Sequence, residues 1–210
     1  MADNNEILAD LKKSVETWNL ALAKTATQAG IDAGMAPKDI INAMGDGMAV
    51  VGDRFDKAEV YLPQVVAASK AMDVGLKLLA PLMKGGDDAM KGTVVMGTVE
   101  GDIHEIGKNV CCAMLRGAGY NVIDLGPDAS AEKFVETALE NKAKVVGGSA
   151  LMTTTLLAQK EIVELIKERG VDIKTVFGGA PCTKAWCDEI GADGYSASAP
   201  DCVDLINSIY

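Results

Sequence analysis

The spacing of apolar residues changes near residue 90, and this change constrains the fold more than any other feature of the sequence. Before Gly85 and Gly86, apolar residues recur every three or four positions, which is the period of amphipathic helices. After residue 90, short β-branched runs alternate with helical patterns. Because 210 residues suffice for two modest domains, we predict a helical domain over residues 1–90 and an α/β domain over residues 91–210.

Residues 1–90 are expected to form a small bundle of the four-helix type. One amphipathic stripe runs from Leu8 through Trp18 to Leu22 and predicts a single helix, which Gly30 and Gly34 end. Two further stripes, over residues 37–55 and 62–79, predict the helices that follow. Each stripe would bury one face in the core of the bundle.

Residues 91–210 are expected to form a doubly wound parallel sheet of the Rossmann-like, flavodoxin-like kind. Four strands are predicted to start at Thr93, Asn121, Lys144 and Lys174, and helices near Ile106, Ala131, Thr155, Thr183 and Pro200. Strands that alternate with helices form right-handed βαβ units and therefore parallel sheets. Such sheets bind ligands beyond the carboxyl ends of their strands, so the loops after Gly97, Gly148 and Phe177 should converge on one site.

Charge and hydropathy exclude several classes of function. The chain has 20 Lys and Arg against 30 Asp and Glu, and this net charge of −10 disfavours nucleic acids and anionic membrane surfaces as partners. No apolar stretch reaches the roughly 18–20 residues of a membrane span, and the N-terminus lacks the regions of a signal peptide. We therefore expect a cytoplasmic protein. Five cysteines without a CxxC pair favour neither a disulfide framework nor a zinc ribbon.

The glycines after the first predicted strand match neither common nucleotide-binding motif. Neither Gly97 nor Gly101 begins a GxGxxG pattern, which disfavours NAD and FAD. Gly101, Gly107 and Lys108 approach a P-loop, but five residues separate the glycines and Asn109 stands where Ser or Thr is required. We reject both motifs.

His104 is the single histidine, so the chain cannot build a multi-histidine metal site. Asp102 precedes it by two residues, close enough for the carboxylate to accept the imidazole N–H while the other ring nitrogen faces outward. This is how carboxylates orient metal-bound histidines. Without further signals, a surface or capping histidine would be the simpler interpretation.

Three motifs at fixed intervals carry a resemblance to a known family. DxHxxG covers residues 102–107, SxL covers 149–151 after 41 further residues, and a glycine pair stands at 178–179 after 26 more. This ordered set resembles the signature of cobalamin-binding domains that hold the corrinoid base-off, with histidine as lower axial ligand of cobalt. SALMTTTL, residues 149–156, is similar to corrinoid proteins of one-carbon methyltransferase systems.

The resemblance implies roles for the matched residues. His104 would ligate the cobalt, and Asp102 would orient and polarise the imidazole. Ser149 would hydrogen-bond in the slot that takes the displaced nucleotide tail, while Gly178 and Gly179 would let the backbone approach that tail. The further cofactor contacts that the resemblance implies are Ile103, Gly107, Leu151 and Thr153.

Thr155 stands where related methionine synthases have the serine of an Asp-His-Ser relay. The hydroxyl is kept, so the resemblance implies that Asp102, His104 and Thr155 take up a proton when the histidine releases cobalt. Thr155 also lies where a helix is predicted to begin, so a structural role as N-cap stays open beside the relay.

The segment from Gly45 to Val66 is similar to the cap of methyl-carrying corrinoid domains. By position in that motif, Phe55 and Leu62 would cover the upper face of cobalt as a movable apolar lid that excludes water. Their spacing of seven equally fits ordinary bundle core, so this alternative remains.

The resemblance implies a methyl carrier that catalyses little alone. A substrate:corrinoid methyltransferase would methylate Co(I), and a second methyltransferase would pass the methyl group from methyl-Co(III) to tetrahydrofolate or coenzyme M. A reductive activating protein would rescue oxidised cobalt. The methyl donor cannot be read from this chain. The alternative is a cobalamin-responsive sensor or regulatory module, which the acidic charge and the lack of a DNA-binding module disfavour.

Overall fold

The computed structural model describes residues 3–82 and 90–210, which belong to two compact units. The helical unit comprises the residues up to Lys91 together with 113–120, and the α/β unit comprises 92–112 and 121–210. Gly85 and Gly86, the predicted break, lie outside the described residues. The division into two domains, residues 1–90 and 91–210, stays a prediction.

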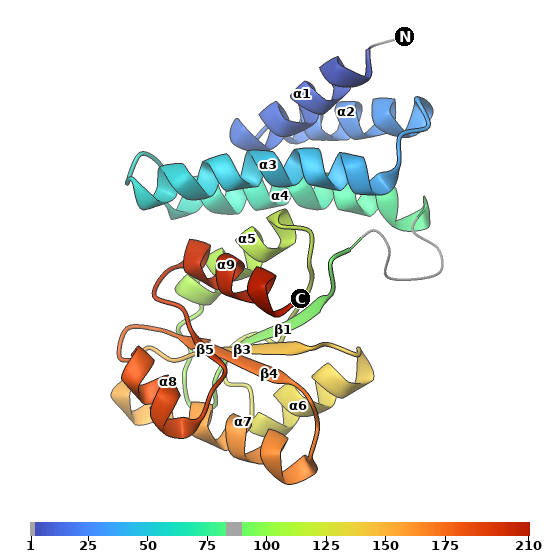
Figure 1. Ribbon diagram of the computed structural model, residues 1–210. Helices are drawn as coiled ribbons and strands as arrows, with labels where there is room; N and C mark the ends of the chain where they lie inside the picture. The colour runs from blue at the N-terminus through green and yellow to red at the C-terminus, as the bar shows by residue number, and fades with distance from the viewer. Residues whose placement is uncertain (1–2, 83–89) are drawn as a thin grey trace. The chain divides into compact units, whose positions relative to one another are not determined.

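The described part of residues 3–82 is helical. Its helices are α1 (Asn4–Glu16), α2 (Leu20–Asp32), α3 (Pro37–Asp56) and α4 (Leu62–Leu79), followed by the short 3-10 helix η1 (Ala80–Leu82) (Figure 1). The buried faces of α1, α3 and α4 form its core: Leu11, Val15, Ile40, Met44, Met48, Val65 and Met72. The apolar stripes of the sequence therefore mark the packed faces, as amphipathic helices require.

The single helix predicted from Leu8 to Leu22 is wrong, because the chain turns between α1 and α2. Trp18 adopts a left-handed backbone with φ of +57°. Asn19 then caps α2, its side-chain oxygen accepting the N–H of Leu22 at 3.0 Å. The spacing of three and four between apolar residues continues across this turn, so the spacing alone could not indicate that the helix ends.

The α/β unit contains a parallel sheet in the order β2-β1-β3-β4-β5. Its strands are β1 (Thr93–Thr98), β2 (Asn121–Asp124), β3 (Val145–Ser149), β4 (Lys174–Gly178) and β5 (Gly194–Tyr195). The fold class and the first four strands are confirmed. β5 was missed, because two residues without a β-branched run carry no strand signal.

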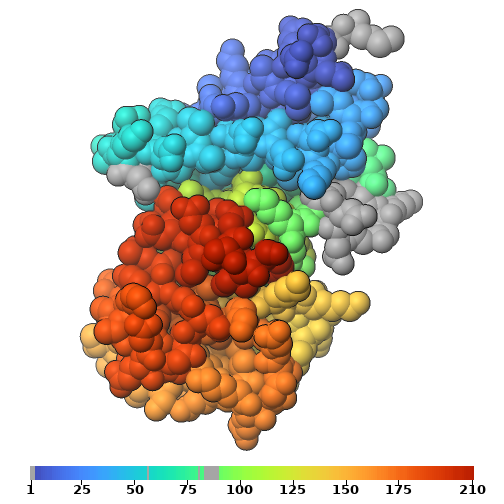
Figure 2. All heavy atoms as spheres, in the orientation of Figure 1, coloured from blue at the N-terminus to red at the C-terminus, as the bar shows by residue number. Residues whose placement is uncertain are grey.

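Helices cover both faces of this sheet. The helices are α5 (Ile106–Gly117), α6 (Ala131–Glu140), α7 (Leu156–Arg169), α8 (Lys184–Ile190) and α9 (Ala199–Ile209), with the 3-10 helix η2 (Thr153–Thr155) before α7. α6, α7 and α8 lie on one face, and α9 with the first half of α5 lies on the other (Figure 1). Figure 2 shows α9, in red, as one continuous patch on the surface of this unit. None of the described helices is long and apolar enough to cross a bilayer.

The strand order creates a switch point beside β1. The chain passes from β1 to β2 on one side and then crosses to β3 on the other side. The loops that follow β1 and β3 therefore diverge at the carboxyl edge, where sheets of this topology bind ligands. Both loops carry residues that the sequence singled out.

Candidate functional site

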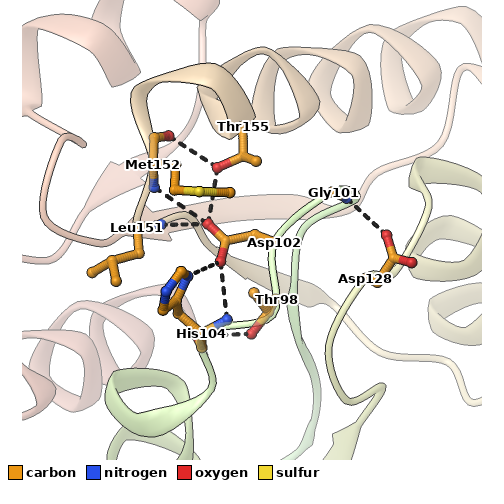
Figure 3. A network of polar contacts seen from close by, with 8 residues as sticks. All are labelled: Thr98, Gly101, Asp102, His104, Asp128, Leu151, Met152 and Thr155. Carbon is orange, nitrogen blue, oxygen red and sulfur yellow. Dashed lines mark hydrogen bonds and ion pairs between the residues drawn. The ribbon is translucent and has the colours of Figure 1, made fainter.

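The carboxylate of Asp102 joins the loop after β1 to the loop after β3 (Figure 3). Asp102 is fully buried, and its Oδ1 accepts the backbone N–H of His104 at 3.0 Å. Its Oδ2 accepts the N–H groups of Leu151 at 2.7 Å and Met152 at 3.3 Å, and lies 2.9 Å from the hydroxyl of Thr155. The two loops are thus fixed through one side chain.

These hydrogen bonds keep Asp102 ionised. Burial alone would raise the pKa of its carboxyl, because a charge is poorly solvated inside a protein. The N–H groups of His104 and Leu151, the imidazole and the Thr155 hydroxyl outweigh this effect and hold the pKa of Asp102 well below its usual range. The carboxylate is therefore a permanent acceptor for the histidine beside it.

The imidazole of His104 is oriented by that carboxylate. Nδ1 lies 2.7 Å from Oδ1 of Asp102, which makes Nδ1 the hydrogen-bond donor, so in the neutral imidazole the lone pair belongs to Nε2. The His104 side chain is 45% exposed, in contrast to its buried partner. This is the arrangement of a metal-binding histidine whose other nitrogen is held by a carboxylate.

Side chains alone do not complete a metal site here. Within the described residues, no group of three or more His, Cys, Asp and Glu side chains is placed to hold a metal ion. His104 can therefore supply one ligand to a metal that brings its other ligands with it, as the cobalt of a corrin ring does.

The surroundings of His104 fit a flat and largely apolar macrocycle. Ile103 is 74% exposed, and Ile106, Leu151 and Met152 are also exposed apolar side chains of the same two loops and the start of α5. At Gly107, in the first turn of α5, an added Cβ would have no protein atom within 4 Å. Exposed apolar side chains cost hydration free energy that a bound macrocycle would recover.

Thr155 occupies the N-cap position of α7, but its side chain makes no capping hydrogen bond. The hydroxyl instead lies 2.9 Å from both Oδ2 of Asp102 and the carbonyl oxygen of Met152, and it is buried. A capping role for this side chain is therefore wrong. The structure brings Thr155, Asp102 and His104 together, while their action as a proton relay stays a prediction.

The residues predicted to line the tail slot lie at the ends of β3 and β4. Ser149 ends β3 half-buried and pairs in register with Gly178, and Thr153 is exposed at the start of η2. Gly179 has φ of +118°, and a Cβ there would overlap the carbonyl oxygen of Ala150. The fold alone thus requires glycine at 179, and the role of this pair toward a nucleotide tail stays a prediction.

Phe55 and Leu62 flank the turn between α3 and α4. Phe55 lies in the last turn of α3, Leu62 begins α4, and both are half-buried. Both belong to the helical unit, whereas His104 belongs to the α/β unit. Their role as a lid therefore stays a prediction.

Sequence reasoning missed the contacts of Asp128 and of Lys108. Oδ1 of Asp128 accepts the N–H of Gly101 at 2.7 Å, from the loop after β2. Lys108 resembled the lysine of a P-loop, yet its buried Nζ pairs with Asp124 at 2.5 Å and Glu105 at 3.3 Å. The expected convergence of loops covered those after Gly97, Gly148 and Phe177 but not the loop after β2, so no signal in the sequence pointed to Asp128.

Comparisons with known proteins find relatives that cover nearly the whole chain. The sequence matches the family described as the B12 binding domain over residues 92–203, and a second B12 binding domain family over residues 7–80. It is 43% identical to trimethylamine corrinoid protein 2 of Methanosarcina acetivorans over 213 residues, covering 99% of this chain and 98% of that protein. A corrinoid protein of Desulfitobacterium hafniense is 42% identical, with 97% of each chain covered.

A solved structure resembles the whole chain. The methanol:cobalamin methyltransferase complex MtaBC of Methanosarcina barkeri contains a chain with a TM-score of 0.87 and 33% identity. The match covers 99% of the present chain and 80% of that one.

Proposed function

Because this chain belongs to the family of B12-binding corrinoid proteins of methyltransferase systems, we propose that it carries a methyl group between two methyltransferases on a bound corrinoid. The observation that carries this proposal is the exposed His104 imidazole, whose Nδ1 is held at 2.7 Å by a buried carboxylate, so that Nε2 is the nitrogen left for a metal. The bound corrinoid would supply the cobalt that takes up and gives up the methyl group.

In this proposal, the residues of the chain hold the corrinoid and set its lower axial ligand. Nε2 of His104 would bind cobalt, with the corrinoid in its base-off form. Asp102 accepts a hydrogen bond from Nδ1–H, which increases the electron donation of the imidazole. When His104 dissociates from the cobalt, a proton would be taken up and shared among Asp102, His104 and Thr155.

The other predicted contacts complete the binding surface. Ile103 and Leu151 would lie against the macrocycle, and Gly107 would leave room for its edge. Ser149, Thr153 and the glycine pair at 178–179 would line the slot for the nucleotide tail. Phe55 and Leu62, from the helical unit, would exclude water from the upper face of the cobalt.

The partners follow from the same proposal. A substrate:corrinoid methyltransferase would load the methyl group, and a second methyltransferase would transfer it to tetrahydrofolate or coenzyme M. A reductive activating protein would restore cobalt that has been oxidised. One relative of known structure is part of a complex named as a methanol:cobalamin methyltransferase, which supports a methyltransferase as partner. A cytoplasmic location is part of the proposal.

The single histidine makes a direct test available. Protein grown with ¹⁵N-histidine, and prepared without a histidine tag, carries the label only at His104. After loading with cobalamin and reduction to Co(II), electron paramagnetic resonance should show the ¹⁵N coupling pattern of one axial imidazole. His104→Ala contains no labelled histidine and should still bind cobalamin, so its spectrum is the reference without imidazole coupling. A wild-type spectrum without ¹⁵N coupling, identical to that reference, would overturn the ligation.

Methyl transfer is tested separately. The reduced, cobalamin-loaded protein should be methylated by a cognate substrate:corrinoid methyltransferase and its donor, and then demethylated by the second enzyme. Failure with every donor among methanol, methylamines, quaternary amines and methoxylated aromatics would favour the sensor alternative over the carrier.

A further inference from the structure

Asp128, in the loop between β2 and α6, adopts a backbone conformation that residues other than glycine rarely take. Its φ is +52°, in the left-handed region, where a side chain costs roughly 1–2 kcal/mol. Asp tolerates this region better than most residues because its short carboxylate can bond to nearby backbone. Here the carboxylate reaches a residue 27 positions earlier in the chain.

Two hydrogen bonds of Asp128 hold consecutive residues of the loop that carries His104. Oδ1 of Asp128 accepts the N–H of Gly101 at 2.7 Å (Figure 3), and the N–H of Asp128 donates to the carbonyl oxygen of Asp102 at 3.0 Å. Gly101 has φ of +79°, so this loop reverses direction where Asp128 holds it. A bond from a carboxylate is stronger than one from a neutral acceptor.

Asp102 is therefore fixed from two sides. Its side chain is bound by Leu151 and Thr155 from the loop after β3, and its backbone carbonyl by Asp128 from the loop after β2. Capping α6 does not explain Asp128, because Ser130 is the N-cap of that helix and accepts the N–H of Lys133.

We propose that Asp128 is a positioning residue for the imidazole of His104. By fixing Gly101 and the backbone of Asp102, it sets the direction of Nε2 and so the share of bound corrinoid that His104 ligates. The positioning concerns the chain alone, whereas the effect on ligation rests on the proposed function.

Three variants separate the carboxylate from the backbone conformation. Asp128→Gly keeps the left-handed backbone but removes the acceptor, and Asp128→Asn keeps an oxygen that can accept the N–H of Gly101. Lys142→Gly is the matched control, because Lys142 is also exposed and has φ of +52°, in the loop before β3 at the opposite edge of the sheet.

The first measurement uses the protein without corrinoid. In Asp128→Gly, the Gly101 amide should exchange its hydrogen about tenfold faster, because its acceptor is lost. The Nδ1 proton of His104, observed by ¹⁵N-histidine labelling, should exchange faster as well. The amide of Thr98, bound to the carbonyl of Gly126 at 3.0 Å, is the internal control and should not change.

The second measurement uses cobalamin-loaded protein reduced to Co(II). The share of cobalt with a ¹⁵N-coupled imidazole should fall in Asp128→Gly and stay at the wild-type level in Asp128→Asn and Lys142→Gly. The proposal is overturned if Asp128→Gly keeps both the wild-type exchange rate of the Gly101 amide and the wild-type share of imidazole-ligated cobalt. It is also overturned if Lys142→Gly lowers that share as much as Asp128→Gly does. If no variant shows imidazole coupling, the ligation by His104 fails, and the amide exchange still decides the positioning.

Discussion

The ammonium group of Lys108 lies 2.5 Å from Oδ1 of Asp124, which joins the first turn of α5 to the end of β2. The two side chains differ in burial, because that of Lys108 is fully buried whereas that of Asp124 is 27% exposed. Oδ1 of Asp124 also accepts the N–H of Gly126 at 2.9 Å. Removing Asp124 should therefore lower the free energy of unfolding by a different amount than removing Lys108.

We expect Asp124→Ala to lower the free energy of unfolding by about 3 kcal/mol, since the buried ammonium then keeps, among the described residues, only the more distant carboxylate of Glu105. Lys108→Met should cost less, about 1–2 kcal/mol, because Asp124 keeps partial hydration and the Gly126 N–H. Urea unfolding of the apo-protein measures both changes.

Lys184→Ala is the control for this pair of variants, because it removes an exposed ion pair with Asp188 and should change stability by less than about 0.5 kcal/mol. Equal costs for Asp124→Ala and Lys108→Met would contradict the argument from unequal burial.

Gly179→Ala should be strongly destabilising, by about 3 kcal/mol or more, because the new Cβ would overlap the Ala150 carbonyl. Gly126→Ala is the matched control: its φ of +78° is also left-handed, but a Cβ there meets no atom within 4 Å. That variant should lose only about 1–2 kcal/mol from the backbone strain. Thermal unfolding compares them, and similar losses would refute the steric account.

The strands and the Asp102–His104 pair could be predicted because their signals are local. β-branched runs mark strands directly, and two residues of separation bring a carboxylate within reach of an imidazole. The resemblance to methionine synthases then added Thr155, whose hydroxyl lies 2.9 Å from Oδ2 of Asp102 although the two residues are 53 positions apart. These predictions needed no knowledge of packing.

The features that sequence reasoning missed depend on contacts between distant segments or on single dihedral angles. Trp18 has a positive φ, and because it is not a glycine, the sequence gives no sign of the turn at this position. β5 exists because Tyr195 pairs with Phe177 on the neighbouring strand, which no periodicity within two residues can indicate. Asp128 reads as an ordinary loop residue until the sheet brings its carboxylate to Gly101.

Tyr210 should make stability depend on alkaline pH. Its hydroxyl donates to the carbonyl of Thr93 and accepts the N–H of Lys144 at 3.2 Å, and the Lys144 ammonium lies 5.6 Å from the ring centroid. Burial raises the pKa of Tyr210 above 10.0. The unfolded chain therefore loses this proton first, so the contribution is complete below pH 10.0 and disappears as the pH rises through the native pKa.

Tyr210→Phe isolates this effect from the titration of the lysines. At neutral pH the wild type should be more stable than this variant by about 1–2 kcal/mol, because the variant lacks both hydrogen bonds. The difference should shrink above pH 10.0 in urea unfolding. A difference that is constant or grows with pH would contradict the direction of the pKa shift.

Gly107→Ala should separate stability from corrinoid binding. Gly107 lies inside α5, where alanine is favoured over glycine by about 0.5–1 kcal/mol, and the added Cβ meets no protein atom within 4 Å. The apo-protein should therefore be as stable as the wild type or slightly more stable. If the macrocycle lies over this turn beside His104, the added methyl group occupies space that the macrocycle needs, and the dissociation constant for hydroxocobalamin should rise about tenfold or more.

Absorbance titration of the apo-protein measures this dissociation constant, with Ser208→Ala in the last turn of α9 as a distant control. Unchanged affinity in Gly107→Ala would place the macrocycle away from the start of α5, and a loss of apo-protein stability would show that the open space at Gly107 is not available to a Cβ.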